Sequence, residues 1–154
     1  MGHAAFFRRW PAFQHGGRIM TARRKTVLPT PAELRILQVL WHLGQATVEE
    51  VVNHSHASPK PNYKTVQTLL RIMEQKGLAR HATRGRVFVF EPRVSREEVG
   101  QLSVRTLMEQ NFGGSPAELL VNLLEAGPVE ETELDELEAL IKNYRLQKRE
   151  SSSS

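Results

Sequence analysis

Hydrophobic residues near the start of the chain recur at the spacing of a buried helix face. In "TPAELRILQVLWHLG" (residues 30–44) this spacing predicts a helix. Its apolar positions are Leu34, Leu37, Leu40 and Trp41. Thr30 is a good N-cap, and Glu33 completes a capping box with it. We expect this helix to end at Gly44 and to belong to the core.

A short helix and a longer helix follow. Thr47 caps the short one, whose apolar residues are Val48, Val51 and Val52. After the turn-rich loop "SHASPKPNY", the segment "NYKTVQTLLRIMEQKG" (residues 62–77) carries Val66, Leu69, Leu70 and Met73. On a helix, the last three of these lie within about 60° of Val66. This stripe predicts a helix that faces the core and stops at Gly77.

The polar residues of this longer helix point away from its apolar stripe. Lys64, Thr68, Arg71 and Gln75 lie between about 140° and 200° from Val66 around the helix. Lysine and arginine suit phosphates or guanine edges, glutamine suits base amides, and threonine suits hydroxyl contacts or a thymine methyl. The pattern is therefore typical of a helix that reads DNA, rather than of an ordinary surface helix.

Alternating residues on both sides of "TRGR" in "LARHATRGRVFVFEP" predict a β-hairpin, with Val87–Phe90 as the stronger strand. Three helices followed by a hairpin with a basic tip form a winged helix-turn-helix. In such a domain the N-terminal half of the second helix of the motif enters the major groove, and the hairpin reaches a minor groove or its phosphates. The predicted DNA-binding residues are Asn62, Lys64, Thr65, Gln67, Thr68, Arg71, Arg84 and Arg86.

From Ser95 onward, three helices are predicted and no strand. Each segment, "SREEVGQLSVRTLMEQNF", "SPAELLVNLLEAG" and "TELDELEALIKNYRLQKRE", begins with a Ser or Thr cap followed by acidic residues. Their apolar faces predict dimerisation with a second copy through Leu119, Leu120, Leu123, Leu124, Leu134, Leu137, Leu140, Ile141 and Tyr144. The alternative is that these faces pack back on the first domain. The expected fold class is mainly α with a small β-hairpin, a winged helix-turn-helix followed by a helical dimerisation domain.

Charge divides the chain at the same place. Residues 1–94 hold 15 Lys and Arg against 5 Glu, whereas residues 95–154 hold 6 against 12 acidic residues. A basic first half indicates a polyanionic partner, and an acidic second half is repelled by that partner. The first half is therefore expected to bind double-stranded DNA.

The sequence also argues against several other classes of function. The absence of cysteine excludes disulfides, thiolate zinc sites and cysteine nucleophiles. His54 and His56 stand two apart in a loop end with no carboxylate beside them, which argues against a metal site. We find no nucleophile triad, glycine-rich phosphate loop or His-Glu zinc motif, so we expect neither an enzyme nor a cofactor. No apolar run suggests a membrane span or a secretory signal, and a cytoplasmic protein is expected.

The expected domains are a flexible basic arm (1–26), the winged helix (27–94), the dimerisation domain (95–148) and a disordered tail (149–154). Met20 is an alternative start site, so no function beyond phosphate contact is assigned to the residues before it. The serious alternative to a DNA reader is a winged helix used as a protein-contact scaffold without sequence-specific DNA reading.

The segments "TPAELRILQVLWHLGQATVEEVV", "YKTVQTLLRIMEQKG" and "GRVFVFEP" together resemble the penicillinase-repressor family of transcriptional regulators, the BlaI/MecI/CopY type. The resemblance runs from about Leu28 to Lys148. It implies a homodimeric repressor that binds a dyad-symmetric operator of the TACA/TGTA type. Carried across by position, it implies major-groove contacts by Lys64, Thr65, Thr68 and Arg71, with Arg86 on the wing. It also suggests control by a membrane-bound metallopeptidase sensor.

Three features depart from that family. Ile72 stands where the penicillinase repressors carry an arginine, so half-site preference is expected to differ. Their Asn-Phe cleavage site aligns near Arg105 and Thr106, and the Asn111-Phe112 dipeptide is out of register, so cleavage there is not expected. The copper-responsive members use C-terminal cysteines, which this chain lacks.

Overall fold

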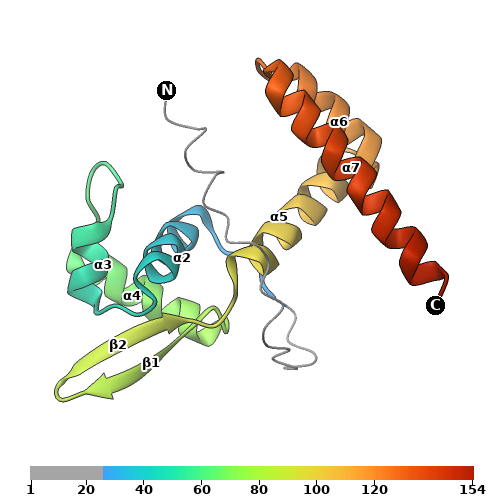
Figure 1. Ribbon diagram of the computed structural model, residues 1–154. Helices are drawn as coiled ribbons and strands as arrows, with labels where there is room; N and C mark the ends of the chain where they lie inside the picture. Colours follow the sequence, from blue (N-terminus) through green and yellow to red (C-terminus); the bar gives the residue numbers. More distant parts are fainter. Residues whose placement is uncertain (1–25) are drawn as a thin grey trace.

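The computed structural model describes residues 26–154, and its elements follow the predicted order. Three helices come first: α2 (Pro31–Leu43), α3 (Val48–His54) and α4 (Tyr63–Gln75). Next come β1 (Ala79–Arg84), β2 (Val87–Pro92), α5 (Arg96–Asn111), α6 (Pro116–Glu125) and α7 (Glu131–Ser152) (Figure 1). The predicted fold class is confirmed. The predicted basic arm lies outside the described residues except for Thr26. Below, the winged half means residues 26–94 and the helical half means residues 95–154.

The core of the winged half lies where its three helices meet the hairpin. Its largest fully buried apolar side chains are Leu37 and Leu40 from α2, Val51 from α3, Val66, Leu70 and Met73 from α4, and Leu78 before β1. Removing a side chain of this size from water contributes about 1.5–3 kcal/mol. Helix α4 is therefore held firmly along its inner side.

Local capping fixes the ends of these helices as predicted. The Thr47 N–H donates to Glu50 Oε2 at 2.7 Å, and the Glu50 N–H donates to Thr47 Oγ1 at 3.2 Å, which completes a capping box. Helix α2 ends before Gly44, whose φ of 81° lies in the left-handed region that favours glycine.

Glu33 differs from the sequence-based expectation. The Glu33 N–H does donate to Thr30 Oγ1 at 3.2 Å, so the cap itself is present. The Glu33 carboxylate, however, does not return to the cap, and capping at α2 is therefore one-sided. That carboxylate is buried and accepts a hydrogen bond from Lys76 Nζ at 2.6 Å. The capping-box prediction for Glu33 was thus half wrong, because a cation distant in sequence competes for the carboxylate.

The hairpin is antiparallel, with Ala79 opposite Pro92 and Arg84 opposite Val87. A two-residue turn joins the strands at Gly85, whose φ is 63°. Two-residue hairpin turns require such positive φ values, which explains the glycine between two arginines.

A short bridge, which the sequence did not predict, ties the base of the hairpin to the helices. Ala46 and Phe90 exchange two backbone hydrogen bonds of 2.9 Å and 2.8 Å. Both residues are buried in the core. The hairpin is therefore anchored to the α2–α3 connection as well as to α4.

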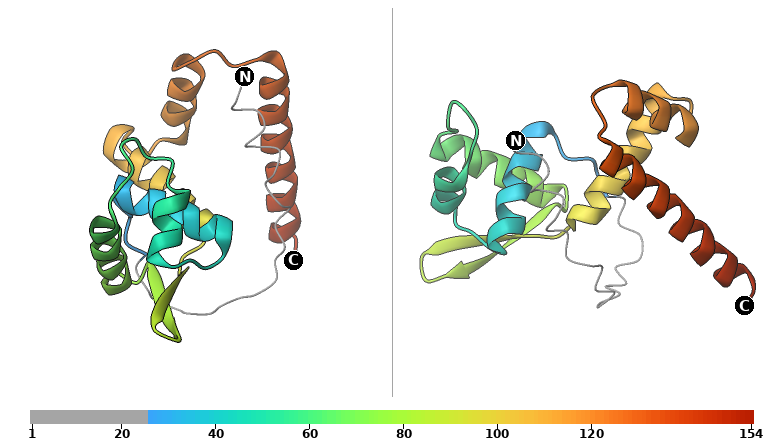
Figure 2. Two further views of the ribbon diagram at one scale, coloured as in Figure 1. Left: turned by 90° about the vertical axis from the view of Figure 1, so that its left-hand side faces the viewer. Right: turned by 45° about the horizontal axis from the view of Figure 1, so that its top comes forward.

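The helical half is attached to the winged half through the start of α5. Val99 is buried in the core, and the indole Nε1–H of Trp41 donates to the Val94 carbonyl at 2.9 Å. Ser95 caps α5 in a reciprocal pair with Glu98, as the sequence indicated. From there α5 leads away, and α6 and α7 lie apart from the winged half (Figures 1 and 2).

Helices α6 and α7 partly follow the sequence-based expectation. Ser115 caps α6, because its Oγ accepts from the Glu118 N–H at 3.2 Å. The N-cap of α7 is Glu130, so the expected Thr cap at Thr132 lies inside the first turn instead. Helix α7 continues to Ser152, and the tail predicted to be disordered from residue 149 is therefore mostly helical. Among residues 26–154, no helix is both long and apolar enough to cross a membrane.

Candidate nucleic-acid interface

Helix α4 has the two distinct faces that its sequence predicts. Val66, Leu70 and Met73 are completely buried against α2, α3 and the hairpin base, and Leu69 is half-buried. On the opposite side a set of exposed polar residues forms what we call the reading face, which consists of Lys64, Thr65, Gln67, Thr68 and Arg71. The core therefore fixes which side chains of α4 are presented to solvent.

Asn62 lies at the start of the reading face, but its side chain has a structural task. Its Oδ1 accepts from the Thr65 N–H at 2.8 Å and caps α4. This leaves the Asn62 side-chain NH2 group as the available donor. The residue predicted as a DNA contact therefore also sets the first turn of the helix.

Glu74, the only acidic residue of α4, directs its carboxylate to the hairpin rather than to the reading face. Its Oε1 accepts from the His81 backbone N–H at 3.2 Å and lies 2.5 Å from His81 Nδ1. The His81 ring in turn stacks on Phe88, with ring centroids 4.3 Å apart. The reading face thus keeps its positive character, and α4 is joined to the hairpin near its C-terminal end.

The Glu33–Lys76 ion pair fixes the C-terminal end of α4 on its other side. Lys76 is the C-cap of α4, and Glu33 lies in the first turn of α2. Glu33 Oε2 is buried and has no hydrogen-bond partner among the described residues. Sequence reasoning missed both this pair and the Glu74–His81 contact, because nothing local in the sequence indicates that these partners meet.

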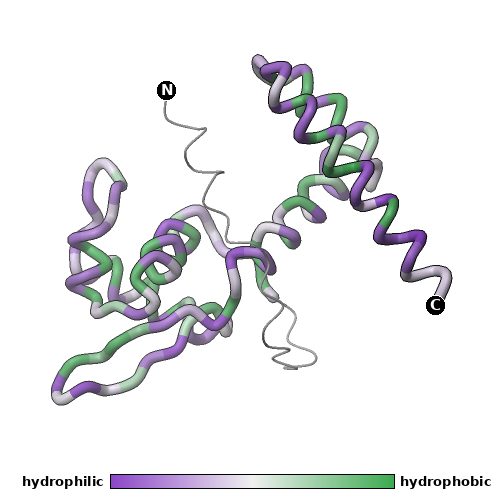
Figure 3. The backbone as a smooth tube through the Cα atoms, in the orientation of Figure 1, coloured by the Kyte–Doolittle hydropathy of each residue, from purple (hydrophilic) through white to green (hydrophobic). Residues whose placement is uncertain are grey.

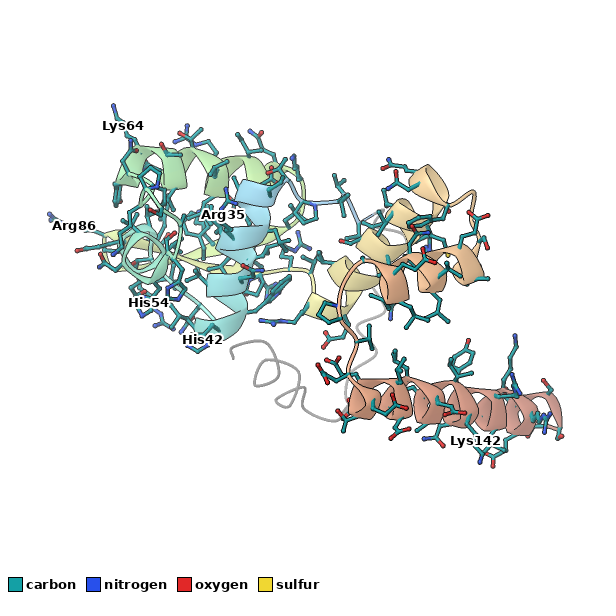
Figure 4. The ribbon with its side chains drawn as sticks, turned by 90° about the horizontal axis from the view of Figure 1, so that it is seen from above. Arg35, His42, His54, Lys64, Arg86 and Lys142 are labelled. Carbon is teal, nitrogen blue, oxygen red and sulfur yellow. The ribbon has the colours of Figure 1, made fainter. Side chains whose placement is uncertain are left out.

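The two arginines at the hairpin tip differ in the contacts of their side chains. Arg86 lies in the turn and points away from the winged half, as does Lys64 on α4 (Figure 4). Arg84 Nη2 instead donates to Gln45 Oε1 at 3.2 Å, which holds it against the α2–α3 connection. Arg86 is therefore the freer of the two to reach a distant phosphate.

An exposed aromatic residue on the hairpin was not among the predicted site residues. Phe88 is 51% exposed beside Val87, which is 50% exposed. The alternation that predicted the strand also marked Phe88 as apolar, and only the register shows that it lies outside the core. Its place next to the His81 ring puts an apolar surface beside the basic tip.

A metal site is not formed by the described residues. Within residues 26–154 no group of three or more His, Asp or Glu side chains is arranged to hold an ion. His54 Nδ1 donates to the Glu50 carbonyl at 2.9 Å, which closes the last turn of α3.

The helical half exposes apolar side chains along its length. Leu140 is 65% exposed, Tyr144 68% and Leu123 54%, and no residue of α6 or α7 is buried. Hydrophobic stretches recur along both helices (Figure 3). Leu124, Leu134 and Ile141 of the predicted set are also exposed, whereas Leu119, Leu120 and Leu137 are partly covered. Four exposed apolar residues were not predicted: Val104, Leu107, Val121 and Leu146. The alternative, in which these faces pack back on the winged half, is not the arrangement of the described residues.

Known proteins resemble this chain over both halves. The penicillinase repressor family matches residues 29–143. The penicillinase repressor of Bacillus licheniformis is 25% identical over 119 residues, which are 77% of this chain and 93% of that protein. The penicillinase repressor of Staphylococcus aureus is 17% identical over 117 residues, 76% of this chain and 93% of that protein.

A solved structure of a relative also matches part of this chain. It is the monomeric form of Bacillus licheniformis BlaI in complex with the blaP half-operator, with 28% identity and a TM-score of 0.42. The match covers 49% of this chain and 93% of that one. The resemblance inferred from the motifs is confirmed by the family match across residues 29–143. The chain belongs to the penicillinase repressor family, whose members are DNA-binding transcriptional repressors and not enzymes.

Proposed function

We propose that this protein represses transcription as a homodimer bound to a dyad-symmetric operator. Each protomer places α4 in a major groove and the hairpin beside it. Two winged halves, held together by their helical halves, meet successive major grooves on one side of the duplex and block polymerase. The family to which the chain belongs supports this function, and the two-faced α4 is the observation that carries it.

The reading face supplies the chemistry that base recognition needs. Arg71 is exposed opposite the buried stripe and suits bidentate contact with guanine. Lys64 and Gln67 offer a cation and an amide on the same side, and Thr65 and Thr68 offer hydroxyl and methyl groups. Arg84 and Arg86 on the hairpin are assigned to backbone phosphates.

Dimerisation through the helical half follows from its unburied apolar residues. Exposed leucines at this density are costly for an isolated chain, and a second copy offers the same surface in a closed, symmetric arrangement. The acidic residues of this half favour its projection away from DNA. The proposed domains are therefore a DNA-binding unit over residues 27–94 and a dimerisation unit over residues 95–148.

A membrane-bound metallopeptidase sensor is a proposed partner on family resemblance alone. Arg105 and Thr106, which align with the cleavage site of the penicillinase repressors, lie inside α5. Proteases take extended chains, so cleavage at that position requires local opening of α5.

Binding to promoter DNA tests the proposal. We expect the full chain to bind the promoter of its own or a neighbouring operon more tightly than random duplex, as measured by fluorescence anisotropy. The slope of log affinity against log salt is expected to be about −0.9 for each phosphate neutralised. Equal affinity for promoter and random duplex at moderate salt would show that the protein is not a specific repressor, and favour a scaffold role.

A further inference from the structure

A small apolar cavity, partly open to solvent, lies in the winged half between α2, the α3–α4 loop and α4. Its volume is about 170 Å³. Its walls include Ile36 and Val39 from α2, Val51 from α3, Pro59 and Pro61 from the loop, and Leu69 from α4. Apolar cavities of about 150 Å³ in proteins accommodate a benzene ring. The cavity therefore has the size and lining for one aromatic ring.

One cation lines this cavity. Arg35 is exposed on α2 beside α4 (Figure 4), and it is the only charged residue of the lining. No described residue forms a hydrogen bond or an ion pair with its side chain. A guanidinium presents a fork of donors that matches a carboxylate. An occupant with an aromatic ring and one carboxylate satisfies both the walls and the cation.

Among the described residues, the loop beside the cavity forms its side-chain hydrogen bonds only with nearby residues. The Ala57 N–H donates to Ser55 Oγ at 3.3 Å, and Lys60 Nζ donates to the Asn53 carbonyl at 3.5 Å. These bonds join the loop to itself and to the end of α3. The loop can therefore move to admit a ligand without breaking hydrogen bonds to α2.

We propose that this cavity binds a small aromatic carboxylate, with the ring against the apolar walls and the carboxylate on Arg35, and that occupancy weakens DNA binding. Thr65 of the reading face also lines the cavity, so the ligand contacts α4 beside its DNA-facing side chains. The ligand also neutralises one cation of the basic winged half, which lowers the attraction for phosphates. The effect on DNA rests on the proposed function, whereas the ligand site does not.

Benzoate titrated into the full chain without DNA tests the site. We expect saturable shifts of the methyl resonances of Val39, Val51 and Leu69 in NMR spectra. In the Arg35→Gln variant, benzoate affinity is expected to fall about tenfold, because a charge-assisted contact is lost. Neutral benzyl alcohol is expected to bind both proteins equally, which also shows that the cavity of the variant is intact. Arg93→Gln, at an exposed arginine outside the cavity, is the matched control.

Two results would overturn the site: no saturable shift at these methyl groups, or equal loss of benzoate affinity in Arg35→Gln and Arg93→Gln. The effect on DNA is measured separately by operator titrations with and without benzoate. Benzoate is expected to weaken operator binding by the wild-type chain and to have a smaller effect on Arg35→Gln. If benzoate fills the cavity and operator affinity is unchanged, the regulatory half of the proposal is wrong. If the chain binds no operator at all, the proposed function fails, and the methyl shifts still decide the ligand site.

Discussion

The two halves of the chain place their leucines in opposite environments. Leu37, Leu40 and Leu70 are completely buried in the winged half, whereas Leu123 and Leu140 in the helical half are 54% and 65% exposed. A leucine contributes its stabilisation of about 1.5–3 kcal/mol only when it leaves water. The winged half therefore has a core of its own, and α6 and α7 lack one. A single chain therefore fixes by itself which face of α4 is exposed, whereas its apolar side chains on α6 and α7 stay in contact with solvent.

Truncating one leucine in each half is expected to give the largest effects, and effects of a different kind in each half. Leu70→Ala is expected to lower the free energy of unfolding by about 2–5 kcal/mol, because it removes buried contacts and leaves a cavity under α4. Leu140→Ala is expected to weaken dimerisation and to leave the fold of the winged half unchanged. Chemical denaturation at two protein concentrations, with sedimentation, separates these effects. A wild-type chain that sediments as a monomer at micromolar concentration would contradict the dimer.

The ion pair between α2 and α4 gives the next largest expected effect. Lys76→Met leaves the Glu33 carboxylate buried without its cation, which is expected to cost about 3 kcal/mol or less, since Lys76 retains some exposure. Replacing both residues, in Glu33→Leu with Lys76→Met, is expected to recover most of the loss. Chemical denaturation measures both.

The matched control for this pair is Arg80→Met. Arg80 pairs with Glu91 on the hairpin surface, where both side chains are well exposed. Exposed pairs contribute about 1 kcal/mol or less. Equal destabilisation by Lys76→Met and Arg80→Met would show that the buried carboxylate does not hold α4 in place.

Periodicity was sufficient to predict the main elements and the orientation of α4. Val66, Leu70 and Met73 recur with the helical repeat, so the direction of Lys64 and Arg71 follows from local geometry. The same reasoning marked the apolar faces of α6 and α7. It could not show whether those faces were covered, because burial depends on distant segments.

The errors arose where a side chain had two possible partners. Glu33 stands at the capping-box position, and only the fold brings Lys76, 43 residues away, within 2.6 Å of it. At the start of α7, Glu130 precedes Thr132, and the helix begins at the earlier residue. The short bridge between Ala46 and Phe90 was missed for a different reason. It is a backbone pairing between two distant segments, and no local sequence pattern fixes their register.

Within the winged half, the reading face should determine sequence discrimination. Arg71→Ala is expected to reduce the free-energy difference between operator and mismatched duplex by about 1–3 kcal/mol, because a bidentate base contact is lost. Gln75→Ala is the matched control, because Gln75 shares the polar side of α4 but lies at its exposed C-terminal end and is not among the predicted DNA contacts; it should preserve discrimination. Competition anisotropy with operator and mismatched duplexes measures both. Uniform weakening on every duplex by Arg71→Ala would reassign this side chain to the phosphate backbone.

The smallest effect is expected at the hairpin tip, where the two arginines differ in their partners. Arg86→Ala should weaken binding to all duplexes about equally and reduce the magnitude of the salt slope by about 1, as the loss of one phosphate contact requires. Arg84→Ala should change the slope less, because the guanidinium of Arg84 is already engaged by Gln45. Anisotropy titrations at several salt concentrations compare the variants. If Arg84→Ala alone reduces the slope, the hydrogen bond between Arg84 and Gln45 breaks when DNA binds, and Arg84 is the hairpin residue that contacts a phosphate.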